Sequence, residues 1–177
     1  MGFYVVQFLT GLSSASALFL VASGLSIIFG VTRIVNFAHG SLYMLGAFVA
    51  YSMVAAFSGI YGYWISVFGA AVVVGLIAVF IEILILRRVY QAPELFQLVA
   101  TFGPILIIQD IALAIWGPED LFSVSAPGLD GAITIMGTAL PEYDLALIAL
   151  SFIVLGGLWL LFNRTRWGTL VRAATED

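Results

Sequence analysis

Polar side chains that could bind a small charged molecule gather at one point between long apolar runs. On a helix Asn36, His39, Gly40 and Tyr43 share one face, with Ser41 close by, which predicts a helix start lined with hydrogen-bonding groups. The backbone amides of such a start suit an anionic group, and a substrate carboxylate is the obvious candidate. Capping of the helix and binding to its neighbours explain the same residues without any ligand.

A carboxylate, Asp110, lies beside Gln109 inside another apolar run. At membrane depth a carboxylate is costly unless it is paired, protonated or facing water. Asp110 is therefore predicted either to face a polar pathway or to pair with another helix. Pro104 in the same run predicts a kink or an interruption, because proline removes a backbone donor.

The sequence shows no arrangement of residues for catalysis. It has none of the patterns GxxxxGK[ST], HExxH and GxSxG, and it has one histidine and no cysteine. We therefore expect no catalytic residue, no metal site and no cofactor, and the chain is not expected to be an enzyme. The net charge is −4 and lysine is absent, so there is no basic stripe for nucleic acid.

Composition indicates that these residues are carried by helices in a membrane. The chain is 63% hydrophobic and 9% charged, with a mean hydropathy of +1.16, whereas roughly a quarter of the residues of soluble domains are charged. Its apolar runs are long enough to cross ~30 Å of hydrocarbon as helices. A transmembrane β-barrel would show alternating segments of ~10 residues instead. The predicted fold class is all-α, a polytopic transmembrane helical bundle.

About five membrane spans are predicted, and the second and fourth are the helices that could be broken within the membrane. An outer loop is expected over 117–143 and a cytoplasmic segment over 163–177. The spans are 5–29, 38–57, 64–86, 96–116 and 144–162.

Charge placement predicts which end of each span faces the cytoplasm. If the spans alternate, all six arginines fall on one side, and the other side carries acidic residues only. Lys and Arg are enriched in cytoplasmic loops, so the N-terminus is expected outside and the C-terminus inside. A first or second span that breaks and re-enters would change this parity.

Two further features concern packing and the outer loop. Small residues on one face, at Ala71, Gly75 and Ala78 and again at Gly46 and Ala50, favour close helix approach in lipid. In the outer loop, the sequence GAITIMGTAL has glycines around a β-prone stretch. This pattern is compatible with a small hairpin and equally with an ordered linker.

The polar stretch and its surroundings resemble a known family. GLSIIFGVTRIVNFAHGSLYMLGAFVAY is similar to the N-terminal region of permease subunits from branched-chain amino acid ABC importers, and TFGPILIIQDIALAIWGPE resembles their fourth-helix region. The matching positions in the first segment are Gly24, Phe29, Gly30, Arg33, Asn36, Ala38, His39, Gly40, Met44 and Gly46.

The tail NRTRWGTLVRAATED gives a second, independent match. It is similar to the cytoplasmic loop with which these permeases dock on their ATPase. The alternative is that its arginines only set the orientation of the chain in the membrane. The positions that match are Arg164, Thr165, Gly168, Arg172 and Ala173.

The resemblance implies a function, a location and partners. It implies a multi-pass subunit of the cell inner (plasma) membrane that forms the translocation pathway of an ATP-driven importer. ATP hydrolysis would take place in separate cytoplasmic ATP-binding subunits. A second permease subunit, an extracytoplasmic substrate-binding protein and membrane lipid are the other implied partners.

Several alternatives stay open. The same motif also resembles the urea and short-amide branch of the superfamily. An ATPase-independent carrier or channel is a second alternative. Because family members are much longer than this chain, we expect a truncated permease domain over 1–177, and an inactive fragment is a third alternative.

Overall fold

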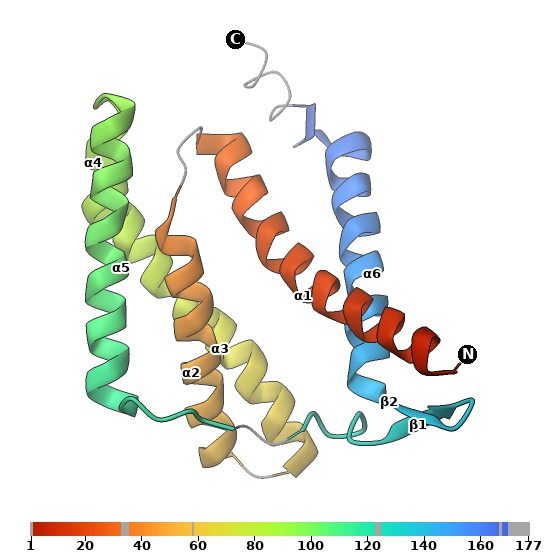
Figure 1. Cartoon of the computed structure of the whole chain (residues 1–177). Coiled ribbons are helices and arrows are strands. Elements are labelled where there is room, and N and C mark those ends of the chain that lie inside the picture. Colours follow the sequence, from red (N-terminus) through yellow and green to blue (C-terminus); the bar gives the residue numbers. More distant parts are fainter. Residues whose placement is uncertain (1, 33–35, 58, 123–124, 167, 170–177) are drawn as a thin grey trace. The chain divides into compact units, whose positions relative to one another are not determined.

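The computed structural model describes residues 2–32, 36–57, 59–122, 125–166 and 168–169. Within them, five helices are long and apolar enough to cross a membrane, as the composition predicted (Figure 1). The chain divides into two compact units, Met1–Arg33 with Ser125–Asp177, and Ile34–Val124. We call them the α1/α6 unit and the α2–α5 unit.

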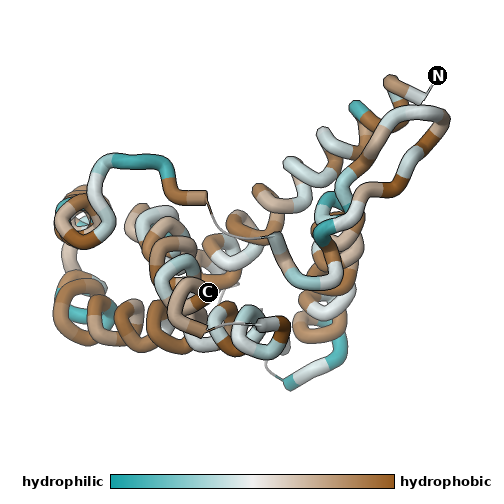
Figure 2. The backbone as a smooth tube through the Cα atoms, turned by 90° about the horizontal axis from the view of Figure 1, so that it is seen from below, coloured by the Kyte–Doolittle hydropathy of each residue, from teal (hydrophilic) through white to brown (hydrophobic). Residues whose placement is uncertain are grey.

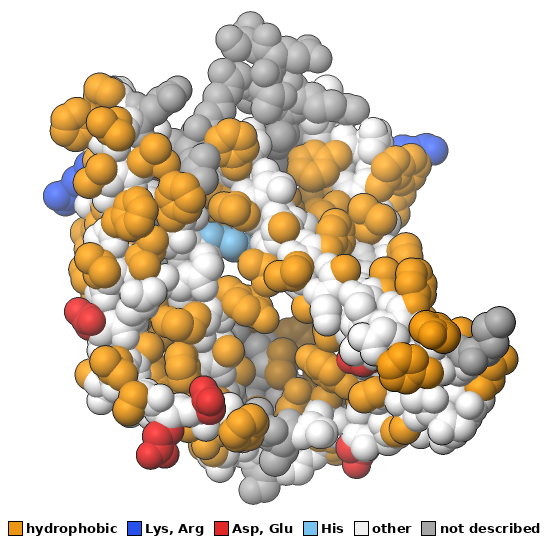
Figure 3. Space-filling model, viewed as in Figure 1, with side chains coloured by type: hydrophobic (Ala, Val, Ile, Leu, Met, Phe, Trp, Pro, Cys, Tyr) orange, Lys and Arg blue, Asp and Glu red, His pale blue; other side chains and the backbone are white. Residues whose placement is uncertain are grey.

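The α2–α5 unit contains three of the long helices. It consists of α2 (Ala38–Ala56), α3 (Gly59–Ile81), the π-helical turn η1 (Glu82–Leu86), α4 (Arg87–Val89) and α5 (Glu94–Trp116). Its core forms where Leu42 and Leu45 of α2 meet Ile108 of α5, with residues of α3 packed around them. Apolar surface covers much of each unit, as expected for helices whose outer surfaces face lipid (Figure 3).

The spans predicted to allow a break are continuous helices in the described residues. Helix α2 runs without interruption from Ala38, and α5 contains Pro104 within its length. Proline is tolerated there because neighbouring groups can satisfy the backbone carbonyl that it leaves without a donor. The irregular span is the third, where η1 separates α3 from α4.

Helix directions within the α2–α5 unit agree with alternating spans. Near the end of α5, the Trp116 indole donates a 2.7 Å hydrogen bond to Ser52 Oγ near the end of α2, and its ring stacks on Phe48 at 5.1 Å. Helices α2 and α5 therefore run in the same direction. Arg87 and Arg88 lie at the end of this unit where α5 begins, and acidic residues follow α5 at the other end.

The small residues that bring α2 and α3 together are not all those that the pattern predicted. A side chain at Gly69 would meet Met53 Cε at 2.5 Å, and one at Gly46 would meet Val74 at 3.9 Å. Around Gly75, by contrast, nothing lies within 4 Å, and Ala71 is exposed. The close approach uses the neighbouring face of α3, and the Ala71–Gly75 edge is open within this unit.

The α1/α6 unit pairs two helices that run in the same direction, α1 (Gly2–Thr32) and α6 (Glu142–Arg164). Ser13 Oγ donates to Asp144 Oδ1 at 2.9 Å, and Ser151 Oγ donates to Ser16 Oγ at 3.1 Å. All three serines are buried. Beside the second pair lies a shallow apolar groove of about 220 Å³ between the helices. Polar bonds of this kind join helices in lipid, where apolar surface gives little association energy.

A two-stranded hairpin precedes α6, so the hairpin alternative for the outer loop is confirmed. Strand β1 (Ala132–Ile135) pairs antiparallel with β2 (Thr138–Pro141), and Ile135 lies opposite Thr138. The turn residues Met136 and Gly137 both have positive φ, 49° and 83°, which a type I′ turn requires. The hairpin lies beside the start of α1 in two views (Figures 1 and 2).

Candidate functional site

Asn36 organises the start of α2. Its side chain is buried, and its Oδ1 accepts a 3.0 Å hydrogen bond from the backbone N–H of Ala38. Its carbonyl oxygen accepts another, of 3.1 Å, from the N–H of His39. These bonds satisfy two amides that a helix start otherwise leaves without a partner. The geometry therefore gives Asn36 a capping role, and these two amides are already occupied by the chain itself.

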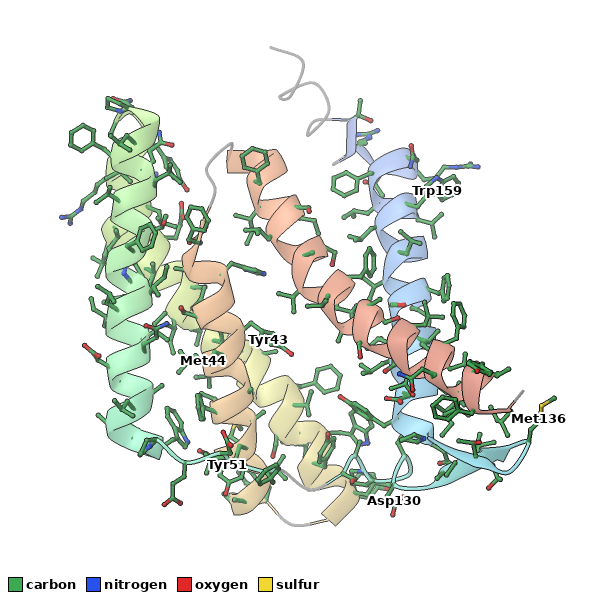
Figure 4. All side chains as sticks on the ribbon, viewed as in Figure 1. Tyr43, Met44, Tyr51, Asp130, Met136 and Trp159 are labelled. Carbon is green, nitrogen blue, oxygen red and sulfur yellow. The ribbon has the colours of Figure 1, made fainter. Side chains whose placement is uncertain are left out.

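The other polar residues of this segment divide between two faces of α2. Ser41 is buried together with Ala38 and Leu42, on the face packed within the unit. Gly40 and Tyr43 are exposed, and Tyr43 projects away from the helix (Figure 4). His39 is half-buried between the two sets. Of the four residues predicted to share one face, Gly40 and Tyr43 lie together on the exposed side, His39 lies at its edge, and Asn36 is buried.

Asp110 is not brought to the start of α2 within this unit. The buried side of α5 consists of Thr101, Pro104, Ile108 and Ala112. Asp110 is two residues from Ile108, which places it about 200° around the helix on the opposite side. It is exposed there, and among the described residues it makes no hydrogen bond or ion pair. A carboxylate on this face of α5 points out of the α2–α5 unit.

The end of α6 is shaped by Thr165. Its backbone is extended, with φ −113° and ψ 156°, so the helix stops at Arg164. The Thr165 hydroxyl donates to the carbonyl of Leu161 and accepts a 3.3 Å bond from the N–H of Gly168. The N–H of Thr169 then bonds to the Thr165 carbonyl at 3.3 Å. One side chain therefore closes α6 and also caps the short helical stretch that follows at Gly168 and Thr169.

Gly168 allows the tight approach of that turn to α6. A Cβ at this position would come within 2.1 Å of the Phe162 carbonyl oxygen, so only glycine fits without a shift of the backbone. Arg164 and Arg166 are exposed on either side of Thr165. The remaining predicted residues of this segment, Arg172 and Ala173, lie outside the described residues.

A polar contact that the sequence reasoning missed lies at the π-helical end of the third span. The Tyr90 hydroxyl donates a short hydrogen bond to the Glu82 carboxylate, and Gln97 Nε2 donates to the Tyr90 and Ala92 carbonyls. Loss of solvent around the phenol, together with the hydrogen bond and the charge of Glu82, raises the pKa of Tyr90 to about 12, against an opposing effect of Arg87. No signal in the sequence could have located this contact, because it follows a π-helical turn in which the N–H of Arg87 bonds to the carbonyl of Glu82, five residues earlier.

The chemistry of these groups is binding and positioning. Hydrogen-bonding groups start α2, a carboxylate lies in the second half of α5, and a capped turn with arginines ends α6. In the described part of the chain, no three His, Asp or Glu side chains gather where a metal ion could bind.

Comparison with known proteins identifies the family. The sequence model of a family described as "Branched-chain amino acid transport system / permease component" matches residues 7–177. The high-affinity branched-chain amino acid transport system permease protein BraD of Pseudomonas aeruginosa is 26% identical over 98% of this chain and 60% of its own length. The corresponding permease proteins LivH of Salmonella typhimurium and Escherichia coli are each 25% identical over 99% of this chain and 60% of theirs. No solved structure matches significantly.

The chain thus spans 60% of the length of the curated relatives that it matches. The family match covers almost the whole chain, including the polar start of α2 and the capped turn after α6. The chain belongs to the family of permease components of branched-chain amino acid transport systems.

Proposed function

We propose that this chain forms the membrane-spanning part of a permease subunit in an ATP-driven importer of branched-chain amino acids. The observation that carries the proposal is the family match over residues 7–177, which includes both segments with unusual polar residues. The relatives BraD and LivH are named as high-affinity permease proteins for the same class of substrate. The location that follows is the cell inner (plasma) membrane.

The proposed pathway residues are Asn36, His39, Gly40, Ser41 and Asp110, with different roles. Asn36 and Ser41 hold the start of α2 in place, since both are buried in the α2–α5 unit. His39 and Gly40 lie closer to the surface and are the groups of this segment that a passing substrate could reach. Asp110 would join the pathway from α5. The free-energy cost of its carboxylate at membrane depth is lowered if the exposed side of α5 lines a polar pathway.

The proposed contact with the ATP-binding subunit is the segment 163–177. The Thr165 hydroxyl caps the short helical stretch at Gly168 and Thr169, and the exposed Arg164 and Arg166 beside it give this end of α6 a basic character on the predicted cytoplasmic side. Thr165 and Gly168 shape the turn, and Arg164, Arg172 and Ala173 would meet the partner. ATP hydrolysis belongs to that partner, and a second permease subunit with an extracytoplasmic substrate-binding protein completes the assembly.

The test is co-purification with the ATP-binding subunit of a branched-chain amino acid importer from the same organism. Tagged chain and ATPase are expressed together, extracted in mild detergent and captured through the tag. We expect the ATPase to be retained by the unmodified chain and lost with Arg172→Glu or with Gly168→Trp, which collides with the Phe162 carbonyl. The matched control is Arg88→Glu. It reverses the charge of another exposed arginine, which is far from 163–177 in the sequence, and it should retain the ATPase.

Three results would contradict the proposal. Equal capture of the ATPase by every variant would contradict a docking role for 163–177. A failure of the unmodified chain to retain any ATPase argues against an ABC permease in this form. Finally, ATPase-independent uptake of labelled leucine in proteoliposomes would identify a carrier.

A further inference from the structure

Met136 occupies a position that its own backbone does not favour. It is the first residue of the two-residue turn between β1 and β2 and is the one non-glycine residue with positive φ in the described part of the chain. Such positions favour Gly, Asn or Asp, because an L side chain there crowds the following carbonyl. Hairpin formation alone therefore gives no reason for methionine at this point.

Packing within the chain does not explain the side chain either. Met136 is 76% exposed at the tip of the hairpin (Figure 4). Its backbone lies close against Gly2, since a Cβ added to Gly2 would come within 2.6 Å of the Met136 Cβ and 2.8 Å of its carbonyl oxygen. The start of α1 thus packs against the turn while the thioether projects outward.

The hairpin around Met136 is uncharged along its whole length. No Asp, Glu, Lys or Arg occurs from Gly131 to Pro141, and the nearest charges are Asp130 and Glu142 at its base. Ile133 on β1 shares a face with Leu140, which is fully buried, and is itself 44% exposed. A soluble loop of this size normally carries charge, whereas an uncharged apolar tip suits a lipid interface.

The position of the hairpin is that of a membrane boundary. It joins directly to the start of α6, at the end opposite Arg164, and lies against the start of α1. Phe3 and Tyr4 at that start are 63% and 74% exposed, and aromatic residues are enriched at such boundaries. Helix α1 has 31 residues, about 46 Å of helix, which exceeds the ~30 Å of hydrocarbon. Its first turns therefore reach the headgroup region or run tilted through it.

We propose that the hairpin tip and the start of α1 form an interfacial anchor that rests in the outer leaflet of the bilayer. The anchor consists of Phe3, Tyr4, Ile133 and Met136. The anchor contacts the boundary between the acyl chains and the headgroups. The lipid that suits it is zwitterionic, since the hairpin tip offers no charge to an anionic headgroup. The anchor requires that the chain is embedded in a membrane in the orientation that its charges predict, and it does not depend on the transport that we propose above.

The chain has no cysteine, so single labels report cleanly on depth. Met136→Cys carries a nitroxide, and the purified chain is placed alone in phosphatidylcholine nanodiscs. Collision with apolar oxygen and with a water-soluble nickel chelate is then measured by electron paramagnetic resonance. Asp130→Cys at the hairpin base is the water-facing reference, and Ile153→Cys, on an exposed face of α6, is the lipid-facing reference.

We expect the label at position 136 to collide with oxygen more than with nickel, and to lie between the two references. A label at 136 that matches Asp130→Cys overturns the proposal. Immobilisation of a water-exposed label only after addition of the extracytoplasmic substrate-binding protein also overturns it, because the tip would then be a protein contact.

A second measurement avoids the label. The native Met136 is oxidised with chloramine-T, a charged oxidant, and its sulfoxide is quantified by mass spectrometry. We expect oxidation severalfold slower in nanodiscs than in a free peptide spanning 128–143. Equal rates would overturn the proposal even if the nitroxide itself had entered the lipid.

Discussion

At the scale of single residues, two side chains decide how spans end on the predicted cytoplasmic side. Thr165 uses one hydroxyl both to close α6 and to cap the turn beyond it. Tyr90 fastens the end of the third span through Glu82, after the π-helical turn. Each residue is polar, and its hydrogen bonds lie at the point where the chain leaves a predicted span.

The contact between Tyr90 and Glu82 predicts a pH dependence. The pKa of Tyr90 lies at about 12 in the folded chain against an ordinary value of 10.0, so folding favours the neutral phenol. This contribution to stability is complete below pH 10.0 and is lost as the pH rises towards 12. Near-ultraviolet absorbance should show a tyrosine ionisation near pH 12 that disappears in Tyr90→Phe.

The matched variant for this prediction is Glu82→Gln. It removes the carboxylate charge and keeps a side chain of similar size, so the ionisation should move back towards 10.0. An ionisation that stays near 12 in this variant would show that Glu82 has no part in the shift.

At the scale of elements, the helices are joined by small and polar residues. Helices α2 and α3 meet where Gly69 makes room for Met53, and α1 and α6 meet along buried serines. Hydrophobic burial gives little association energy between helices in lipid, so such contacts set which faces pair.

The serine contact between α1 and α6 can be measured by a double-mutant cycle. Ser16→Ala, Ser151→Ala and the double variant are compared for unfolding in detergent, and we expect a coupling of about 0.6 kcal/mol. Ser14→Ala is the matched control, because the Ser14 hydroxyl bonds only to the Thr10 carbonyl of its own helix. Additive effects of Ser16→Ala and Ser151→Ala would mean that their hydrogen bond does not stabilise the helix pair.

The elements were largely predictable from sequence, and the reason is their length. Each predicted span lies within one observed helical span or differs from it by a few residues, since long apolar runs have one structure available in lipid. The π-helical turn was not predicted, because EILIL has no Gly or Pro to mark it. The face of α3 that packs on α2 was predicted only in part: Ala78 packs on the core and Gly46 of α2 lies near Val74, whereas Ala71 and Gly75 are exposed.

The candidate site was less predictable than the fold. Residue types located the polar segment at Asn36–Ser41, but the spacing alone could not show which side chains face inward. Asn36 proved to bond its own helix start, and Ser41 is buried against the unit. The sequence could not show which way Asp110 faces, because this depends on which side of α5 is buried. That side is known only once α2 is packed against α5.

At the scale of the whole molecule, the distribution of charge predicts the orientation in the membrane. Cysteine at Asp130 should react with a membrane-impermeant maleimide in intact cells, because the charge distribution predicts that the hairpin base lies outside. Cysteine at Arg88 should react only after permeabilisation, since it follows the third span on the arginine side. The reverse pattern of labelling would invert the assignment of inside and outside for every span.

The π-helical turn at Glu82–Leu86 has a consequence for comparisons among relatives. A single π-turn corresponds to an ordinary helix into which one residue has been inserted. Because the π-helical turn takes up this extra residue within one widened turn, deletion of one residue from EILIL would restore a continuous α-helix and leave the segment beyond it in nearly the same orientation relative to α3. Arg87 and Arg88 would keep their direction. A relative that has one residue fewer here would thus present its cationic pair on the same side, and the gap in the alignment would mark a lost π-turn and not a displaced span.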